Sequence, residues 1–400
     1  MAALSVPTLR PAPVAIVAAG AVTPFGGDVD SFWSALLTGV DGTSAIERFP
    51  VADLRVGWGG EIKKVSMPAG AGRPRGRAAL LLIAAAEDLG ARASLDCDPS
   101  RLAVVVGTAL GGVDELDRAL SGDRTFASAE GALYDSPAER LARWLGARGP
   151  VHTVSMACAS GATAIGLGAD LLRDGRADLV VAGGYDILCR FVMRGFDALR
   201  SLTRDRVRPF DRRRSGLLLG EAAALVLLAR EPDAPRDRLG RLLGYAGASD
   251  GHHVAAPDPE GGGLERAIRQ AMTEADVASD AIDFVSAHGT ATPLNDRIET
   301  AVLKRVLGRR AFEIPVNSIK GALGHTMGAA ATLEAIMCLY AGRHGAVPAT
   351  LGYEEPDPEC DLDYVPGAPR AARPRVSLST SLGFGGCNAA MVVEACEPPR

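Results

Sequence analysis

The sequence predicts an α/β fold with parallel strands. Five apolar runs rich in valine, isoleucine and leucine lead into glycine-rich loops, at residues 14–26, 102–112, 177–186, 282–293 and 376–386. Helical patterns lie between them, at residues 76–91, 161–175, 262–277, 295–308 and 328–342. Apolar runs without polar alternation are typical of strands that are buried on both faces, and their alternation with helices is typical of parallel sheets.

The two halves of the chain begin alike. "VAIVAAGAVTP" starts at residue 14 and "GRLLGYAGASDG" at residue 240, and each is followed by helix, strand, loop and helix. This weak echo predicts a duplicated architecture with halves at 1–238 and 239–400. Two segments of the first half break the pattern: the mostly helical 113–150, expected to cover the sheet, and the loop-rich 186–220, expected to form another cap.

Charge and hydropathy exclude some functions. The net charge is only −5, and the densest basic run, 204–214, also contains Asp205 and Asp211, so no nucleic-acid partner is expected. That run is either a solvated loop or a docking patch for an acidic partner. No apolar run approaches the roughly 20 residues that a membrane-spanning helix needs, so no membrane partner is expected.

The cysteines indicate a reducing compartment. All seven are widely spaced, and no Cys-x-x-Cys pair occurs. An odd count without such pairs disfavours a disulfide framework or a structural zinc site, so we expect a cytoplasmic protein without a bound metal. The apolar segment 14–22 is interpreted as a buried strand followed by a glycine turn, with a secretion signal as the alternative.

Cys158 is the first candidate for chemistry. It follows the apolar "VHTVSM" and precedes a helix rich in small residues. A helix N-terminus carries partial positive charge and free N–H groups, so this position predicts a lowered pKa and an activated nucleophile. The alternative is a small buried cysteine that only packs.

Two further motifs carry candidate residues. His288 follows an apolar run directly in "SAHGTATPLND", where catalytic groups are common. Lys320, His325 and Glu334 surround a small-residue turn in "NSIKGALGHTMGAAATLEA" and could form a charge-balanced buried site. The alternatives are a structural histidine and a capped helix with charges on its surface.

Taken together, these motifs resemble the β-ketoacyl-acyl-carrier-protein synthases. "ACASG" resembles the nucleophile motif of that family, "HGTATPLND" and "KGALGH" its two histidine motifs, and "GFGG" its gating loop. The resemblance covers nearly the whole chain, and the order and spacing of the motifs are specific. It implies the thiolase fold, which has five αβαβα layers built from two similar halves, and a dimer. The first half would carry the nucleophile and the second the two histidines.

The resemblance also implies the reaction. Cys158 would take an acyl group from an acyl carrier protein as a thioester, with the N–H groups of Cys158 and Phe384 as oxyanion hole. Malonyl on the carrier would then lose CO2, and His288 and His325 would stabilise the enolate. Attack on the thioester would give β-ketoacyl carrier protein. The substrates would be attached to the phosphopantetheine of the carrier protein, and the enzyme itself would bind no cofactor.

Other positions match supporting residues of the family. Lys320 and Glu334 would orient the histidine loop. The expected substrate-binding residues are Thr290 and Thr292 on the phosphopantetheine arm, Leu110 at the end of the acyl pocket, His253 near the acyl group, and Phe384 with Gly385 in the gate.

Two features depart from the family pattern. The segment after "KKVSMPAG" is short, and Cys387 stands where threonine is frequent; we interpret Cys387 as a packing residue. The short segment favours a type II polyketide or polyene pathway over fatty acid elongation. Chain length, starter unit, carrier, pathway, and the choice between a homodimer and a heterodimer stay open.

Several other functions were weighed. "GASDG" fits the serine-hydrolase motif but is followed by loop instead of helix. The first strand lacks the dinucleotide-binding glycines. Chain-length factors, the non-catalytic relatives, lack the cysteine that is present here. A ketosynthase that works only when paired with such a factor, or a relative that loads acyl groups without condensing them, remains as the alternative.

Overall fold

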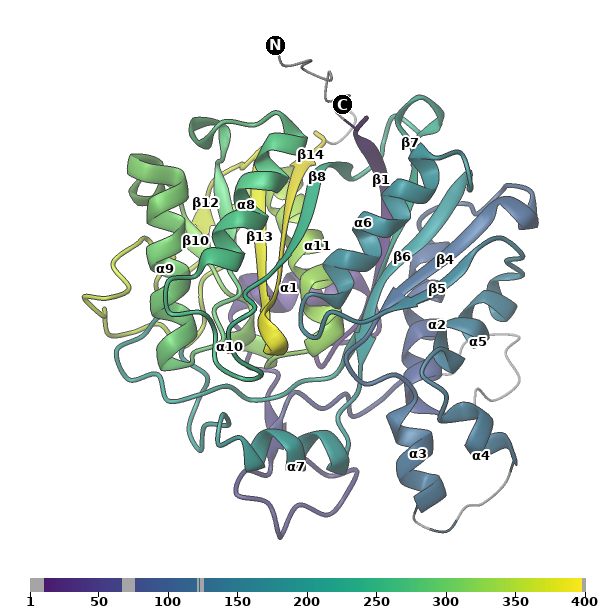
Figure 1. Ribbon diagram of the computed structural model, residues 1–400, viewed down its shortest axis with the longest axis horizontal. Coiled ribbons are helices and arrows are strands. Elements are labelled where there is room, and N and C mark those ends of the chain that lie inside the picture. Colours follow the sequence, from purple (N-terminus) through teal and green to yellow (C-terminus); the bar gives the residue numbers. More distant parts are fainter. Residues whose placement is uncertain (1–10, 67–75, 121, 123–125, 398–400) are drawn as a thin grey trace, which may run out of the picture.

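The computed structural model describes residues 11–66, 76–120, 122 and 126–397. Ten strands form the main sheet, in the spatial order β10-β9-β13-β14-β8-β1-β7-β6-β4-β5 (Figure 1). Their bounds are β1 Val14–Val22, β4 Leu102–Gly107, β5 Val151–Val154, β6 Leu179–Asp186, β7 Ala222–Arg230, β8 Gly240–Ser249, β9 Phe284–Ser286, β10 Val316–Asn317, β13 Val376–Gly383 and β14 Cys387–Ala395. Two small antiparallel pairs lie outside the main sheet: β2 Ser44–Ala45 with β3 Trp58–Gly59, and β11 Ala346–Val347 with β12 Arg370–Ala371.

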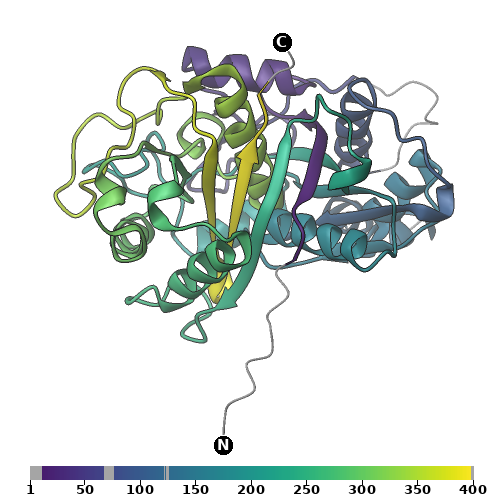
Figure 2. The ribbon, with the colours of Figure 1, turned by 90° about the horizontal axis from the view of Figure 1, so that it is seen from above.

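The sheet consists of two halves with the same strand order. From the seam outward, β1-β7-β6-β4-β5 on one side matches β8-β14-β13-β9-β10 on the other. At the seam, Val14–Ile16 of β1 pair antiparallel with residues 240–242 of β8. Figures 1 and 2 show the two half-sheets side by side, with β8 of one and β1 of the other adjacent at the seam.

The expectation of parallel pairing is only half right. In each half the two outer pairs are parallel, β4 with β5 and β6, and β9 with β10 and β13, while the inner pairs are antiparallel. In the second half, the connection length explains the antiparallel pairing of β13 with β14. β13 turns back into β14 through Phe384–Gly386 alone, and such a short turn can join only antiparallel strands. The sheet is therefore mixed.

Helices form three layers around the half-sheets. The helices are α1 Val29–Thr38, α2 Arg77–Gly90, α3 Val113–Leu120, α4 Phe126–Gly131, α5 Ser136–Leu145, α6 Ser160–Arg173, α7 Arg190–Ala198, α8 Gly262–Ala275, α9 Pro293–Leu307, α10 Lys320–Leu323 and α11 Ala330–His344. α6 and α11 contact strands of both halves and lie between them; α2 and α5 cover the first half, and α8 and α9 the second. The arrangement is the five-layered thiolase fold. Within the described ranges, no helix is long and apolar enough to span a membrane.

The two segments expected to cap the sheet, 113–150 and 186–220, differ in structure. In 113–150, α5 packs against α2, β4 and β5, whereas α3 packs against α4 and α7 (Figure 1). Segment 186–220 contains α7 and a long loop. Part of the basic run 204–214 in that loop is paired inside the molecule, since Arg213 contacts Glu354 at 2.5 Å and Arg214 pairs with Asp357.

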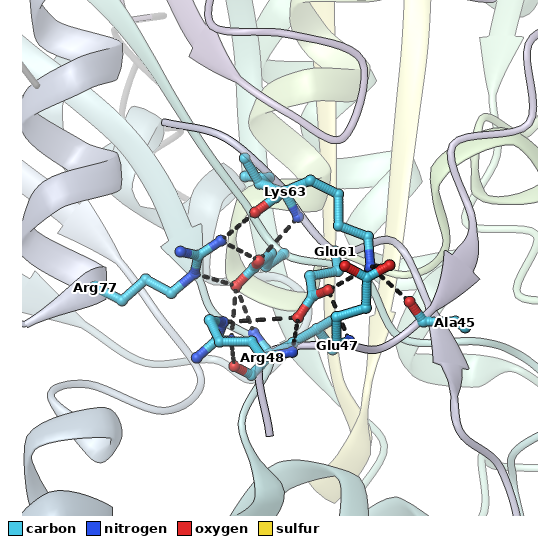
Figure 3. Close-up of polar contacts among 9 residues, drawn as sticks. Ala45, Glu47, Arg48, Glu61, Lys63 and Arg77 are labelled. Carbon is cyan, nitrogen blue, oxygen red and sulfur yellow. Dashed lines mark hydrogen bonds and ion pairs between the residues drawn. The ribbon is translucent and has the colours of Figure 1, made fainter. Parts of the chain in front are cut away.

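Figure 3 shows a partly buried ionic cluster that includes Arg48, Lys63 and Arg77. Two of these residues reach the wholly buried Glu221, which accepts hydrogen bonds from Arg77 at 2.5 Å and from Arg48 at 3.2 Å. The preceding residue, Gly220, donates its N–H to the carbonyl oxygen of His325 at 2.9 Å. The cluster therefore braces the backbone against which the His325 turn lies.

Candidate active site

Cys158 lies in a sharp turn between β5 and α6, two residues before the helix begins. The turn needs an unusual backbone, because Ala157 has a φ of 48°, a left-handed conformation that costs free energy in any residue with a Cβ. Ser160 closes the turn: its hydroxyl accepts from Met156 N at 2.9 Å and donates to Ala157 O at 2.6 Å. This is the strand, turn and helix expected from the sequence.

The small residues after Cys158 allow two turns to meet. A Cβ on Gly161, in the first turn of α6, would lie 2.6 Å from both Gly328 O and Thr332 Oγ1. Real Cβ contacts are never so short, so a larger residue would push the two turns apart. Gly328 lies three residues after His325, and the close approach therefore brings the Cys158 turn against the His325 turn.

Three reactive side chains meet in one buried group. Cys158 Sγ lies 2.9 Å from His325 Nε2, and the rings of His288 and His325 are edge to face with centroids 5.2 Å apart. All three side chains are almost completely buried. His288 comes from the loop after β9 and His325 from the turn after α10, as the motifs predicted.

The backbone fixes the tautomer of His325. Met327 N donates to His325 Nδ1 at 3.3 Å, so in the neutral ring the proton is on Nε2, facing Cys158. Burial and the positive charge of Lys320 hold the pKa of His325 well below its usual value, and the same causes, with His325 added, lower the pKa of His288. Both imidazoles are therefore neutral near pH 7. His288 Nδ1 is buried and has no hydrogen-bond partner in the described part of the chain.

The expected low pKa of Cys158 is wrong. Burial raises the pKa of the thiol to about 12, although the charge of Lys320 and the N–H of Phe384, which donates to the sulfur, both act to lower it. The helix N-terminus is present, but removal of water from the thiol is the larger effect. The resting group is a neutral thiol.

Buried charges support the histidine loops. Lys320 Nζ lies 2.5 Å from Glu334 Oε1, and both side chains are buried, as the motif predicted. Glu299 was not identified from the sequence. Its carboxylate accepts from His288 N at 2.7 Å, from Gly289 N at 2.8 Å and from Thr380 Oγ1 at 2.6 Å.

Asp296 was also missed. It accepts hydrogen bonds from Phe210 N at 2.7 Å and Ala291 N at 3.1 Å, two residues whose φ angles of 62° and 64° are left-handed. Burial raises the pKa of Asp296 to about 7. The only signal in the sequence was that Asp296 and Glu299 lie in the first two turns of a helix, where surface acids are also common.

A cavity of about 370 Å³ leads to the sulfur. It is lined by most of the predicted binding residues: Thr290, Thr292, His253, Phe384 and Gly385. The ring of Phe384 lies 5.4 Å from that of Phe196 on α7. Leu110 does not line this cavity. It is half-buried against the core of the first half, and its N–H donates to Thr108 Oγ1 and Asp186, so its place at the end of the acyl pocket stays a prediction.

The side chains of Cys158, His288 and His325 are also potential metal ligands, so they concern the expectation that no metal is bound. The ligand atoms of Cys158, His288 and His325 lie within 4.8 Å of one another, the closest such group in the described residues. Thiol and imidazole are soft ligands that suit zinc. The nearby charge of Lys320 is paired with Glu334 and does not decide the matter, so the absence of a bound metal stays a prediction.

Comparison with known families decides the identity. Residues 12–234 match the N-terminal domain of β-ketoacyl synthase, and residues 239–354 match its C-terminal domain. The chain is a β-ketoacyl synthase. It is thus a condensing enzyme, an acyltransferase of the 3-oxoacyl-acyl-carrier-protein synthase type.

Relatives of this synthase come from two kinds of pathway. The tetracenomycin polyketide synthase ketoacyl synthase alpha subunit of Streptomyces glaucescens is 38% identical over 95% of this chain and 96% of its own length. The 3-oxoacyl-[acyl-carrier-protein] synthase 2 of Synechocystis sp. is 33% identical over 94% of this chain and 96% of its own length.

Solved structures share the fold. The ishigamide ketosynthase/chain length factor has a TM-score of 0.89 at 30% identity, over 96% of this chain and 99% of that one. AntDE:AntF, a type II polyketide acyl-carrier protein in complex with its ketosynthase, also has a TM-score of 0.89, at 27% identity over 97% of this chain and 100% of that one.

Proposed function

We propose that this synthase extends an acyl group held on Cys158 by two carbons taken from a malonyl group on an acyl carrier protein. One observation carries the proposal. The sulfur of Cys158 is 2.9 Å from the nitrogen of His325 that bears the ring proton, and His288 stands edge-on beside it in a water-excluded site.

Loading is an exchange of thiol and thioester. Cys158 Sγ attacks the acyl carbonyl carbon and its S–C bond forms, while the bond to the carrier thiol breaks. The proton of Cys158 goes to the departing thiolate, so no other base is consumed. The N–H groups of Cys158 and Phe384 are proposed to hold the oxyanion, and the Phe384 N–H already points at the sulfur.

Condensation uses the two histidines. The C–C bond to the malonyl carboxylate breaks, CO2 leaves, and the electron pair moves onto the thioester oxygen as an enolate. Nε2–H of His325 and a ring N–H of His288 are proposed to donate to that oxygen. A neutral imidazole can fill this role, because its one ring N–H donates to the oxygen and the net charge of the ring does not change. The enolate carbon then attacks the Cys158 thioester, the bond from the acyl carbon to Sγ breaks, and the freed thiolate takes up one proton from water.

The carrier arm is proposed to enter through the cavity. Thr290 and Thr292, whose hydroxyl oxygens lie 3.1 Å apart, line it and would hydrogen-bond the phosphopantetheine, and His253 lies nearer its exposed side. Lys320 and Glu334 would orient the histidine turn. The halves 1–238 and 239–400 would divide these roles, in a cytoplasmic dimer.

The pathway proposed is type II polyketide or polyene synthesis, with fatty acid synthesis as the alternative. The 38% identity to a polyketide alpha subunit and the resemblance to a ketosynthase with a chain length factor favour the first, and favour a chain-length-factor-like partner over a homodimer. A relative that only loads acyl groups is less well supported, because both histidines are placed for condensation.

Intact-mass spectrometry tests the proposal. The protein, alone and with a chain-length-factor subunit, is mixed with acyl carrier protein bearing a short acyl chain, and then with malonyl carrier protein. We expect an acyl adduct on Cys158 that disappears as β-ketoacyl carrier protein forms. An adduct that persists would support an acyltransferase, and an adduct on another residue would overturn the assignment of Cys158.

A further inference from the structure

A buried carboxylate outside the predicted site connects its two turns. Asp186 is the last residue of β6 and is wholly buried. Its Oδ1 accepts from Thr108 Oγ1 at 2.7 Å and Leu110 N at 3.1 Å, and its Oδ2 accepts from Ala109 N at 2.9 Å and Gly328 N at 2.7 Å. It therefore binds the loop after β4, in the first half, and the turn after His325, in the second.

The loop after β4 leads to the Cys158 turn. The carbonyl oxygen of Thr108 lies 3.2 Å from the hydroxyl of Ser160, which in turn bonds Met156 and Ala157 beside Cys158. Asp186 is thus linked through Thr108 and Ser160, by three successive polar contacts, to the backbone beside Cys158.

The turn after His325 leads to the imidazole. Gly328, whose N–H binds Asp186, directly follows Met327, whose N–H fixes the tautomer of His325. Met327 itself has a left-handed φ of 51°, a conformation that must be held by its surroundings. The turn packs directly against the carboxylate, because a Cβ on Gly328 would lie only 2.8 Å from Asp186 Oδ2.

We propose that Asp186 is a positioning residue that fixes the turn carrying His325 relative to the turn carrying Cys158. It touches neither the sulfur nor the ring. It sets the distance between Cys158 Sγ and the ring of His325 and the orientation of that ring, on which condensation depends. Loading depends less on this geometry, because the Phe384 N–H and the N-terminus of α6 still face the sulfur. The inference rests on the roles proposed above for Cys158 and His325.

The carboxylate of Asp186 also affects the pKa of Cys158, and this effect predicts the direction in which that pKa should change in the test. Its negative charge adds to burial in raising the pKa of Cys158, while Lys320 lowers that pKa and Glu334 raises it slightly. Replacing Asp186 by asparagine removes one negative charge and leaves the other two groups in place. The thiol should then ionise more readily even as condensation slows, and general loosening of the fold does not predict that combination.

The test compares three rates in the full-length protein, with its partner subunit if activity needs one. They are acyl loading by intact mass, condensation in a single turnover of the loaded enzyme, and alkylation of Cys158 by iodoacetamide across pH. For Asp186→Asn we expect condensation to fall about 10- to 100-fold, as small misplacements do, with loading changed less than about threefold. We expect the pH profile of alkylation to move to lower pH.

Two further variants keep the test decisive. Thr108→Val removes one donor to Asp186 but keeps its charge, so we expect a smaller loss of condensation and no shift of the alkylation profile. Asp88→Asn is the matched control. Asp88 also accepts two backbone N–H groups, from Ala21 and Val29, but it lies on α2, away from the cavity, and should lower stability without changing the ratio of condensation to loading.

The outcomes separate the two proposals. Equal losses of loading and condensation in Asp186→Asn would overturn the positioning role while the unaltered enzyme still loads and condenses. An unaltered enzyme that loads acyl groups but does not condense them would instead overturn the proposed function. If Asp186→Asn fails to fold, Thr108→Val decides: unchanged condensation in it counts against the role.

Discussion

The two halves share a strand order but differ in chemistry. β5 leads to α6 in the first half as β10 leads to α11 in the second, and these equivalent connections carry Cys158 and His325. The first connection is short and presents a neutral thiol. The second is longer, and Lys320, Glu334 and Glu299 are buried around it. A duplicated framework thus brings two loops face to face, and under the proposed function the residues on each loop would divide the reaction into loading and condensation.

The largest expected effect breaks both steps at once. Cys158→Ala removes the sulfur that accepts the acyl group, so loading should fall below detection and condensation with it. Intact mass after incubation with acyl carrier protein measures this. Cys387→Ala is the control, because Cys387 begins β14 and does not line the cavity. Loading that persists in Cys158→Ala would show that the first half does not hold the acyl group.

The second test asks whether the histidines of the second half act in condensation more than in loading. His325→Ala and His288→Ala should each slow condensation about 10²- to 10³-fold, because each removes a donor to the enolate oxygen. Loading should fall far less, since the Phe384 N–H remains on the sulfur. Single-turnover assays measure both steps, with His344→Gln, at the end of α11, as control. A histidine variant that condenses normally would contradict the division of labour.

The third test removes the buried positive charge of Lys320. Lys320→Met leaves Glu334 buried without its partner, which should lower the free energy of unfolding by about 3–5 kcal/mol. The positive charge of Lys320 also lowers the pKa of both histidines, so its loss raises those values. The rings then become protonated at a higher pH, and condensation should be lost earlier as the pH falls.

Urea unfolding and a pH profile of condensation check these two effects. The double variant Lys320→Met/Glu334→Leu should recover much of the stability, because a buried pair can be replaced by apolar groups, but should keep the shifted profile. A profile identical to that of the unaltered enzyme would mean that Lys320 acts only through packing.

The smallest effect belongs to the binding loop of the second half. Thr290→Val or Thr292→Val removes one hydroxyl from the cavity, which is worth about 0.5–1.5 kcal/mol. We expect the KM for malonyl carrier protein to rise about 2- to 10-fold with kcat little changed. Steady-state kinetics at several carrier concentrations measures this, and a fall in kcat with constant KM would place the threonines in the chemical step.

The sequence predicted the fold class, the main helices and the meeting of Cys158, His288 and His325. Those features follow from local patterns and from motifs. It did not predict the raised pKa of Cys158, because a helix N-terminus is visible in a sequence whereas the loss of water around a sulfur is not. Nor did it identify Asp186, which ends a strand as an ordinary polar residue would, and whose four partners come from distant segments.

The contact between Gly161 and Gly328 has a consequence for the newly made chain. Cys158 and His325 are 167 residues apart, which at ribosomal rates of about 5–20 residues per second separates their synthesis by roughly 10–30 s. During that interval the first half can fold around its own strands, but the face of α6 that bears Gly161 has nothing to pack against. His325, Lys320 and Phe384, which surround the sulfur in the complete fold, have not yet been made at that stage. The buried thiol of the finished enzyme therefore depends on residues that are synthesised last.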